Sequence, residues 1–232
     1  PGSIEQAISV AWKAFDIADK FQVPVFILSD QYLADSYYDL PAPDLSKERA
    51  QNHFIKTVKD YQRYQLTADG FSPRGVPGYG DGLVVVDSDE HDPEGHITED
   101  LELRARFVEK RLKKLEQLRN EILPPELIGG DKYETLVVAW GSNYHNVREA
   151  LSLIGDDKVS FLHFSQVYPL HFSAAGYLEK AKRIVAVENN AGGQFAELIE
   201  RETGFAVKER ILKYDGLPFS VEELASRIKG IK

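Results

Sequence analysis

The chain has 232 residues, 43% of them hydrophobic and 28% charged, and its 28 Lys and Arg against 37 Asp and Glu give a net charge of −9. This composition is typical of a globular protein with one large or two small domains; no apolar run approaches the roughly 20 residues of a membrane span, and the negative charge disfavours nucleic acid as a partner. Because the chain has no cysteine, it offers no disulfide, thiolate metal site or iron–sulfur cluster ligand.

The first predicted element is an amphipathic helix over residues 3–21, where apolar side chains recur at steps of three and four. Ser3 and Gln6 have the spacing of a capping box at its start. The chain begins with Pro1, in the middle of a structural unit, and contains no methionine, so we expect the interior of a longer polypeptide. No signal-peptide pattern is present, and we expect a cytoplasmic location.

A short apolar run, Val23–Leu28, follows the predicted helix. Its β-branched residues are typical of a strand buried on both faces of a parallel sheet. The run ends in Ser29, Asp30 and Gln31. Because ligands gather at the carboxyl ends of strands in α/β sheets, these three residues are candidates for the rim of a site.

Residues 37–100 are rich in Asp, Tyr, Pro and Gly, and contain one predicted strand, Gly82–Val86. An irregular stretch of this length is typical of a functional arm or an interdomain connector. A second amphipathic helix is predicted over Leu101–Ile122, and Pro124 and Pro125 end it.

From Tyr133 onward, predicted strands and helices alternate regularly. This βαβα pattern predicts a parallel, doubly wound sheet, with a domain boundary near residue 129. The predicted strands are Thr135–Trp140, Val159–Phe164, Ile184–Val187 and Val207–Leu212, with helices after Ser142, Ser173, Gly192 and Ser220.

The segment from Phe71 to Gly80 holds two prolines and three glycines around Arg74. Such a loop is bent and stiff, and it would present the Arg74 guanidinium for bidentate binding of a carboxylate or phosphate. We therefore name Arg74 and the neighbouring Ser72 as a candidate anion- or substrate-binding pair. The alternative is a surface turn whose arginine pairs with an acid of the chain.

Residues 87–100 hold seven carboxylates and two histidines. Their order does not match a calcium loop, and His91 and His96 lie five residues apart, so we assign no metal ligand. A solvated or interface-facing acidic loop is the favoured interpretation, beside a metal site and a pH-sensitive role for the histidines.

A turn with paired glycines joins a predicted strand to a helix at Val187–Phe195. The helix N-terminus there could hold an anion, which makes Asn189, Asn190, Gly192 and Gly193 candidate binding residues. The alternative is a tight turn at the sheet edge. The Gly-Ser-Asn sequence at residues 141–143 is interpreted as a helix cap.

Several strings resemble, in order and separation, the alpha subunit of 2-oxoacid:ferredoxin oxidoreductases, and the 2-oxoglutarate type fits best. They span essentially the whole chain: Leu28–Ser36, Ser72–Gly78, Asp89–Asp100, Leu162–Leu170, Val187–Phe195 and Leu212–Phe219.

The resemblance implies a thiamine diphosphate enzyme that decarboxylates a 2-oxoacid, passes electrons through [4Fe-4S] clusters to ferredoxin and transfers the acyl group to coenzyme A. It implies an α/β fold in three parts: residues 1–36 end a pyrimidine-binding domain, 37–128 form a connector of arm, loop and helix, and 129–232 form a doubly wound domain similar to the transketolase C-terminal domain. Thiamine diphosphate, Mg²⁺ and the clusters would be held mainly by other segments or by the beta subunit, and none by this chain alone.

The chain departs from the family by lacking its Tyr-Pro-Ile-Thr-Pro motif and the acidic residue that contacts the cofactor's pyrimidine. We therefore expect it to be inactive in isolation and to work with a beta subunit, with an alpha–alpha contact as a further expectation. A pyruvate or branched-chain 2-oxoacid oxidoreductase subunit and a non-catalytic α/β interaction module are the alternatives.

Overall fold

The structure, a computed structural model, describes residues 1–47 and 51–231. The chain divides into two compact units. Unit 1 comprises residues 1–11, 26–45 and 122–232, and unit 2 comprises residues 12–25 and 46–121. No helix of the described residues is long and apolar enough to cross a bilayer.

Unit 1 is built on a five-stranded sheet with the order β3-β5-β4-β6-β7. The last four strands run parallel, and β3 pairs antiparallel with β5 at one edge. This sheet confirms the predicted doubly wound α/β class. The strands are β3 (Glu126–Ile128), β4 (Thr135–Trp140), β5 (Val159–Phe164), β6 (Arg183–Glu188) and β7 (Glu209–Leu212).

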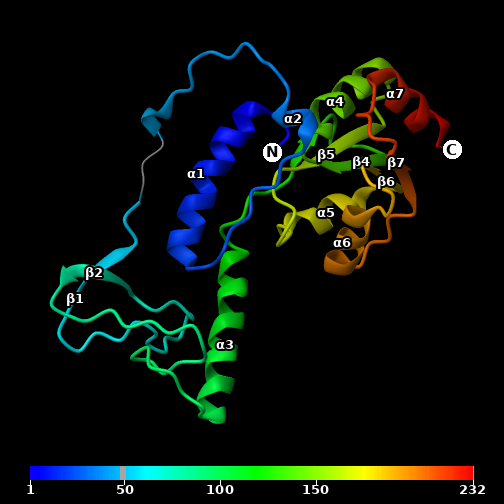
Figure 1. Cartoon of the computed structure of the whole chain (residues 1–232). Helices are drawn as coiled ribbons and strands as arrows, with labels where there is room; N and C mark the ends of the chain where they lie inside the picture. Colours follow the sequence, from blue (N-terminus) through cyan, green and yellow to red (C-terminus); the bar gives the residue numbers. More distant parts are fainter. Residues whose placement is uncertain (48–50, 232) are drawn as a thin grey trace. The chain divides into compact units, whose positions relative to one another are not determined.

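Helices cover both faces of this sheet (Figure 1). Side chains of β4 alternate between the faces: Val137 and Ala139 pack in the apolar cluster with α4 (Asn143–Ile154) and α7 (Val221–Gly230). Leu136 and Val138 pack in the cluster with α5 (Ser173–Lys180) and α6 (Gln194–Thr203). Strands buried on both sides need apolar residues throughout, which is why these runs are continuous in the sequence.

The order of the strands places a topological switch point between β4 and β6. From β4 the chain crosses to β5 on one side, and from β6 it continues to β7 on the other. The following helices, α4 and α6, lie on opposite faces. The carboxyl ends of β4 and β6 therefore adjoin a crevice of the kind in which α/β proteins bind ligands.

The N-terminal segment contains the predicted helix as α1 (Ile4–Phe21), but the predicted strand over residues 23–28 is wrong. These residues pair with no strand among the described residues, and Phe26 is 81% exposed. A strand forms only where a neighbouring strand takes up its N–H and C=O groups, so apolar character alone is insufficient. A short helix, α2 (Gln31–Ala34), follows.

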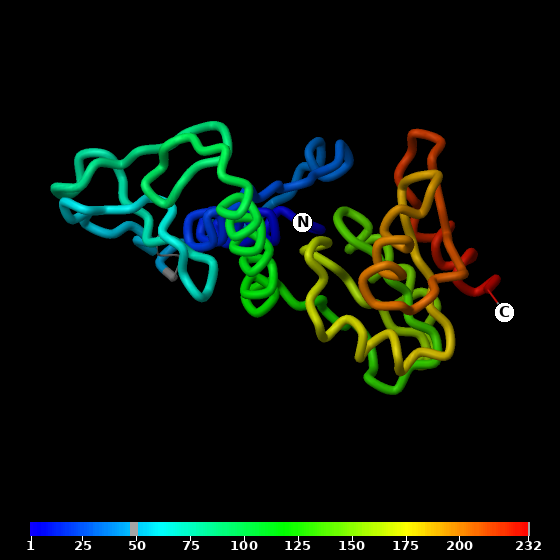
Figure 2. The backbone as a smooth tube through the Cα atoms, turned by 90° about the horizontal axis from the view of Figure 1, so that it is seen from below, coloured from blue at the N-terminus to red at the C-terminus, as the bar shows by residue number. Residues whose placement is uncertain are grey.

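Unit 2 contains a two-stranded parallel sheet of β1 (Phe54–Thr57) and β2 (Arg74–Gly80), together with α3 (Leu101–Leu118). A short 3-10 helix, η1, spans Leu45–Lys47. Long loops connect β1 to β2 and β2 to α3 (Figure 2).

Two expectations for unit 2 are corrected. The strand predicted at residues 82–86 is irregular, and the strand lies instead at 74–80, in the predicted loop. Its glycines permit a close approach, because a Cβ at Gly75 would lie 2.3 Å from Thr57 Cγ2 and one at Gly80 would lie 2.3 Å from the Thr57 carbonyl oxygen. The predicted helix at 101–122 ends earlier, at Leu118.

Candidate functional site

A cavity of about 700 Å³ lies in unit 1 at the carboxyl ends of β4, β6 and β7. It is the crevice at the switch point, and the segment around α2 lines one side of it. The lining residues are Asp30, Gln31, Tyr32, Asp35, Ser36, Ser142, Asn143, Asn146, Asn189, Lys213, Tyr214, Gly216, Leu217 and Pro218.

Asp30 joins the α2 segment to the sheet edge. One of its carboxylate oxygens accepts the N–H of Leu33 at 2.9 Å and caps α2, while the other accepts a hydrogen bond from the hydroxyl of Ser142, directly after β4. Gln31 also lines the cavity, and its amide donates to Asp35 Oδ2 at 3.0 Å. Ser29, the third predicted rim residue, is exposed and is not among the lining residues.

The start of α4 leaves polar groups open to the cavity. Ser142 occupies the N-cap position but makes no side-chain cap, because its hydroxyl is directed to Asp30. The expectation that residues 141–143 cap the helix thus holds for position and not for the hydrogen bond. Asn143 is only 6% exposed, and its side chain has no hydrogen bond within the described part of the chain.

The sequence did not single out Asn143 or Asn146 for this cavity. Asn146 donates to the carbonyl oxygen of Phe219 at 2.9 Å, which fastens the loop before α7. In the sequence, both asparagines follow β4 closely. This position indicates a cavity residue only when it is known that β4 and β6 are neighbouring strands.

The charged side chains that line the cavity are either acidic or, in the case of Lys213, paired with acidic side chains. The Lys213 ammonium lies 3.0 Å from both Asp215 Oδ2 and Glu223 Oε2. Hydrogen bonds to Glu223 and then Asp215 raise the pKa of Lys213 above its ordinary value. With Asp30 and Asp35 also on its wall, the cavity is suited to uncharged polar groups rather than phosphate.

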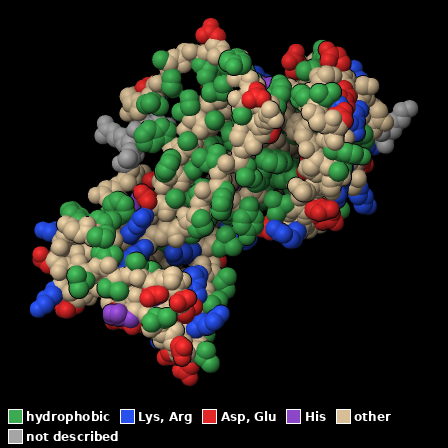
Figure 3. Space-filling view, in the orientation of Figure 1, with side chains coloured by type: hydrophobic (Ala, Val, Ile, Leu, Met, Phe, Trp, Pro, Cys, Tyr) green, Lys and Arg blue, Asp and Glu red, His purple; other side chains and the backbone are tan. Residues whose placement is uncertain are grey.

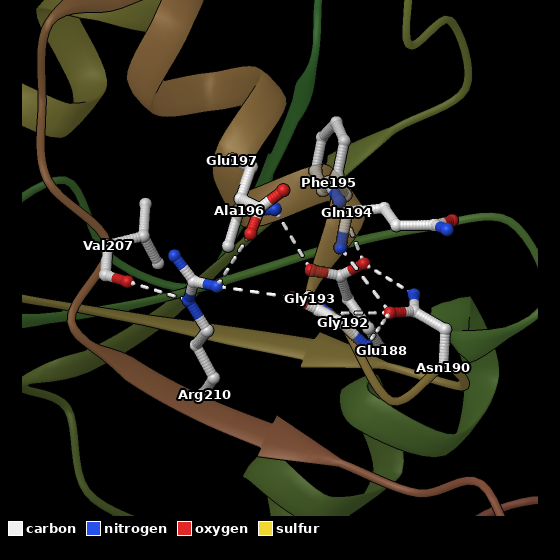
Figure 4. Close-up of polar contacts among 10 residues, drawn as sticks. All are labelled: Glu188, Asn190, Gly192, Gly193, Gln194, Phe195, Ala196, Glu197, Val207 and Arg210. Atoms are coloured by element: carbon white, nitrogen blue, oxygen red, sulfur yellow. Dashed lines mark hydrogen bonds and ion pairs between the residues drawn. The ribbon is translucent and has the colours of Figure 1, made fainter.

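The predicted anion-binding turn after β6 is filled by the chain's own carboxylate (Figure 4). Glu188 is completely buried and accepts the N–H groups of Phe195 and Ala196 at 2.8 and 2.9 Å, at the start of α6. The Asn190 amide donates to the same carboxylate at 2.7 Å. A buried carboxylate at a helix N-terminus is stabilised by the free N–H groups and the helix dipole.

Asn190 completes this arrangement, because its side-chain oxygen accepts the N–H groups of Gly192, Gly193 and Gln194. Gly193 has a φ of 67°, and a Cβ there would lie 2.9 Å from Arg210 Cδ. The amide donors of the turn are thus engaged within the chain. Asn189 alone of the four predicted residues lines the cavity.

Arg74 and Ser72 lie in unit 2 and form internal contacts. The Arg74 guanidinium lies 2.7 Å from Asp19 Oδ1 of α1 and 4.9 Å from the centre of the Phe54 ring. Ser72 is buried, donates to the carbonyl oxygen of Gln65 and accepts from Lys110. Arg74 is therefore paired with an acidic residue of the same chain. Its role in binding an anion stays a prediction.

The acidic segment 87–100 organises unit 2. Glu90 forms two hydrogen bonds with Arg111, and Asp100 caps α3. The His91 ring stacks on Tyr64 at 3.5 Å and meets Phe107 edge-on. Within the described residues, no group of three or more His, Cys, Asp or Glu side chains could hold a metal ion.

The chain is similar to known proteins over its whole length. The family described as pyruvate flavodoxin/ferredoxin oxidoreductase, thiamine diphosphate-binding, matches residues 1–110. The alpha subunit of 2-oxoacid:ferredoxin oxidoreductase 1 of Sulfurisphaera tokodaii is 33% identical over 100% of this chain and 38% of its own length. The chain therefore spans under two fifths of that relative.

Two further comparisons concern proteins named for 2-oxoglutarate. The 2-oxoglutarate synthase subunit KorA of Methanothermobacter thermautotrophicus is 24% identical over 98% of this chain and 61% of its own length. The 2-oxoglutarate:ferredoxin oxidoreductase of Magnetococcus marinus, solved with 2-oxoglutarate, coenzyme A and succinyl-CoA, superposes with a TM-score of 0.90 and 24% identity. The superposition covers 99% of this chain and 41% of that chain, and shows a shared fold.

Proposed function

The chain is homologous to alpha subunits of 2-oxoacid:ferredoxin oxidoreductases, which are enzymes, and we propose that it works as part of such a subunit. The observation that carries this proposal is the 33% identity to an alpha subunit along the entire chain. The reaction would be thiamine-dependent oxidative decarboxylation of a 2-oxoacid, with electrons passed to ferredoxin and the acyl group to coenzyme A.

Within this reaction, the chain would support the thiamine site and lend at most a loop to it. At the turn after β6, Glu188 already fills the α6 N-terminus, so this turn is not free to hold a diphosphate. We therefore place the diphosphate, its Mg²⁺ and the [4Fe-4S] clusters in other segments or in a beta subunit. Residues 1–36 would be the end of the pyrimidine-binding domain, and residues 37–128 would be the connector. Residues 129–232 would form a domain similar to the transketolase C-terminal domain.

The substrate of the complete enzyme would be 2-oxoglutarate. Support comes from the relatives named for 2-oxoglutarate and from the resemblance of the six strings, taken together, to the 2-oxoglutarate type. Pyruvate or a branched-chain 2-oxoacid is the alternative, since the relatives with higher identity are named only for 2-oxoacids.

The decisive experiment is a steady-state assay of the complete alpha subunit that contains this chain, in complex with its beta subunit. We expect reduction of ferredoxin that requires coenzyme A and a 2-oxoacid, with a higher kcat/KM for 2-oxoglutarate than for pyruvate. A higher kcat/KM for pyruvate would show that pyruvate is the substrate, and the proposed class of enzyme would stay the same. Failure of every 2-oxoacid to reduce ferredoxin would favour the non-catalytic interaction module.

The isolated 232-residue chain provides a second test. Calorimetry with thiamine diphosphate and Mg²⁺ should give no binding heat, because we place the residues that hold the cofactor in other segments or in a beta subunit. Binding at micromolar concentration would show that this chain itself holds the cofactor.

A further inference from the structure

Helix α3 of unit 2 carries a stripe of apolar side chains that is largely exposed. The members of this stripe recur at alternating steps of four and three residues: Leu101, Ala105, Val108, Leu112 and Leu115. Leu101 is 78% exposed, Leu112 64% and Val108 40%. Single exposed apolar residues are common on protein surfaces, but a continuous row of them marks an interaction site.

The opposite side of the same helix packs within unit 2. Phe107 and Lys110 are only 1% and 6% exposed. With about 3.6 residues per turn, these two positions lie about half a turn around the helix from the stripe. Phe107 meets the His91 ring edge-on, and Lys110 donates to the carbonyl oxygen of Tyr64. Unit 2 therefore uses one side of α3 and leaves most of the stripe exposed.

The spacing of the stripe is that of a coiled coil. In a coiled coil, apolar residues occupy positions a and d of a seven-residue repeat, and two such rows pack side by side. In α3, the d positions are Leu101, Val108 and Leu115, and the a positions are Ala105 and Leu112. Because unit 2 already holds α3 in helical form, pairing carries no cost of nucleating the helix.

The charged side chains beside the stripe decide which partner helix fits it. The e positions are all glutamate and two g positions are arginine, in the order Glu102, Arg104, Glu109, Arg111 and Glu116. Charges at e and g set the partner and the orientation of a coiled coil. A second copy of α3, parallel and in register, brings Arg104 beside its Glu109, and Arg111 beside its Glu116.

These charges are available for such contacts. Glu102, Arg104, Glu109 and Glu116 are exposed, and their side chains make no ion pair within the described part of the chain. Arg111 binds Glu90 at 3.0 and 2.9 Å, but its side chain is 47% exposed and has further N–H donors. Acidic, basic and hydrophobic side chains lie side by side at the lower end of unit 2 in Figure 3, where α3 begins.

We propose that α3 pairs with α3 of a second copy of this chain as a short, parallel, two-stranded coiled coil. An antiparallel pair would set glutamates against glutamates and arginines against arginines, which is repulsive. The parallel pair has a two-fold axis along the seam, so each charge contact occurs twice. The pairing gives the expected contact between two alpha subunits a location. It does not rest on the proposed reaction, because its test measures mass and not turnover.

The first test is sedimentation equilibrium of the 232-residue chain. We expect a monomer–dimer equilibrium with a Kd below about 0.1 mM. Arg104→Glu places like charges beside each other twice in the dimer and should weaken it by about 5-fold or more. Adding Glu109→Arg to this variant restores the pairing and should restore the Kd. Arg106→Glu is the matched control, because it makes the same charge change at an exposed position outside the seam.

The second test determines the orientation, and it is clean because the chain has no cysteine of its own. Leu101 lies at one end of the stripe, so the two copies of this position meet only in a parallel pair. The variant Leu101→Cys should therefore form a disulfide-linked dimer under mild oxidation. Lys113→Cys, at an exposed position away from the stripe, should cross-link much more slowly.

Any of three results would overturn the pairing. The first is a chain that stays monomeric up to about 1 mM. The second is a dimer that Arg106→Glu weakens as much as Arg104→Glu, or that the double substitution fails to restore. The third is a Leu101→Cys variant that cross-links no faster than Lys113→Cys. Melting curves of the variants verify that they are folded.

Discussion

Arg74 can be either a substrate clamp or an internal tie, and the Asp19 contact makes the two roles separable. The guanidinium lies 2.7 Å from Asp19 Oδ1, at a partly exposed position where an ion pair is worth little on its own. A clamp on an anionic substrate requires the bidentate geometry that lysine lacks. In the complete complex, we expect Arg74→Lys to lower kcat/KM by roughly 10- to 1,000-fold with assembly intact.

The control for this prediction is Asp19→Asn, which removes the internal partner and leaves the arginine. If Arg74 only ties α1 to β2, both variants should lower the melting temperature alike and leave kcat/KM unchanged. That outcome would end the substrate role of Arg74 and of the neighbouring Ser72, which is already occupied by Gln65 and Lys110.

Lys110 should make the stability of the chain depend on pH. Its pKa in the folded state is about 8, below the ordinary value of 10.5, chiefly because of burial and then because of the nearby cations. Between these two values the unfolded chain binds more protons than the folded one, so the free energy of unfolding rises with pH. Below the folded pKa, the full cost of burying the charge is present.

The measurement is denaturant unfolding of the wild type and of Lys110→Met from pH 7 to pH 10.5. The stability of the wild type should increase relative to the variant as pH rises from about 8. A difference that stays constant across this range would show that the folded pKa of Lys110 is not lowered.

Among the elements, α6 depends on a single buried carboxylate. Glu188 accepts two N–H groups of the first turn and one from Asn190. In Glu188→Gln, the new NH₂ group faces these donors and leaves at least one of them unsatisfied. Leaving one buried donor unpaired costs about 1–3 kcal/mol, so we expect a loss of unfolding free energy of that size.

Glu197→Gln is the comparison, because Glu197 lies in the first turn of the same helix but its side chain is 66% exposed. It should change the unfolding free energy by less than about 0.5 kcal/mol. Equal effects of the two substitutions would mean that the buried cap does not determine the stability of α6.

The sheet of unit 1 could be predicted from sequence because each element carries its own signal. Strands such as Thr135–Trp140 are continuous apolar runs between helices with a 3–4 periodicity, and these runs are buried on both faces. The three-residue β3 was missed because it is too short for a pattern. Strand β2 was missed because its Pro and Gly residues indicate a turn, whereas here the glycines permit close packing on Thr57.

The cavity was predictable only in part. Asp30 and Gln31 line it, although the strand from whose end they were predicted does not form. Asn189, which was predicted as part of an anion-binding helix N-terminus, lines it as well. Asn143 and Asn146 require the strand order, which no local pattern contains. Glu188 was missed as the cap of α6. Its carboxylate binds the helix rather than a ligand because it is buried, and this burial cannot be seen from its position in the sequence.

At the scale of the whole molecule, exposed aromatic side chains between residues 32 and 64 predict an assembly surface. Tyr37 is fully exposed, and Tyr32 and Tyr38 are 40% and 43% exposed. Tyrosine is enriched at protein interfaces, where it anchors the buried centre of the contact. We expect this arm to pack on the beta subunit or on a second alpha subunit.

Not every aromatic residue of the arm is free for such a contact. Tyr61 donates its hydroxyl to the carbonyl oxygen of Pro73 and accepts the Gly75 N–H, and Tyr64 stacks on His91. These two residues hold unit 2 together. The predicted contact therefore rests on the stretch 32–38, whose tyrosine rings are the more exposed ones.

Hydrogen exchange of the chain alone and with co-expressed beta subunit measures this prediction directly. Slower exchange should appear in residues 32–40 on assembly, while residues 61–64 should change little because their contacts exist already. Tyr37→Ala should weaken assembly by roughly 10-fold or more if this ring is an anchor, and Tyr79→Ala, an exposed tyrosine of β2, is the matched control. Unchanged exchange at 32–40 in the assembled complex would mean that the arm only connects parts of one chain.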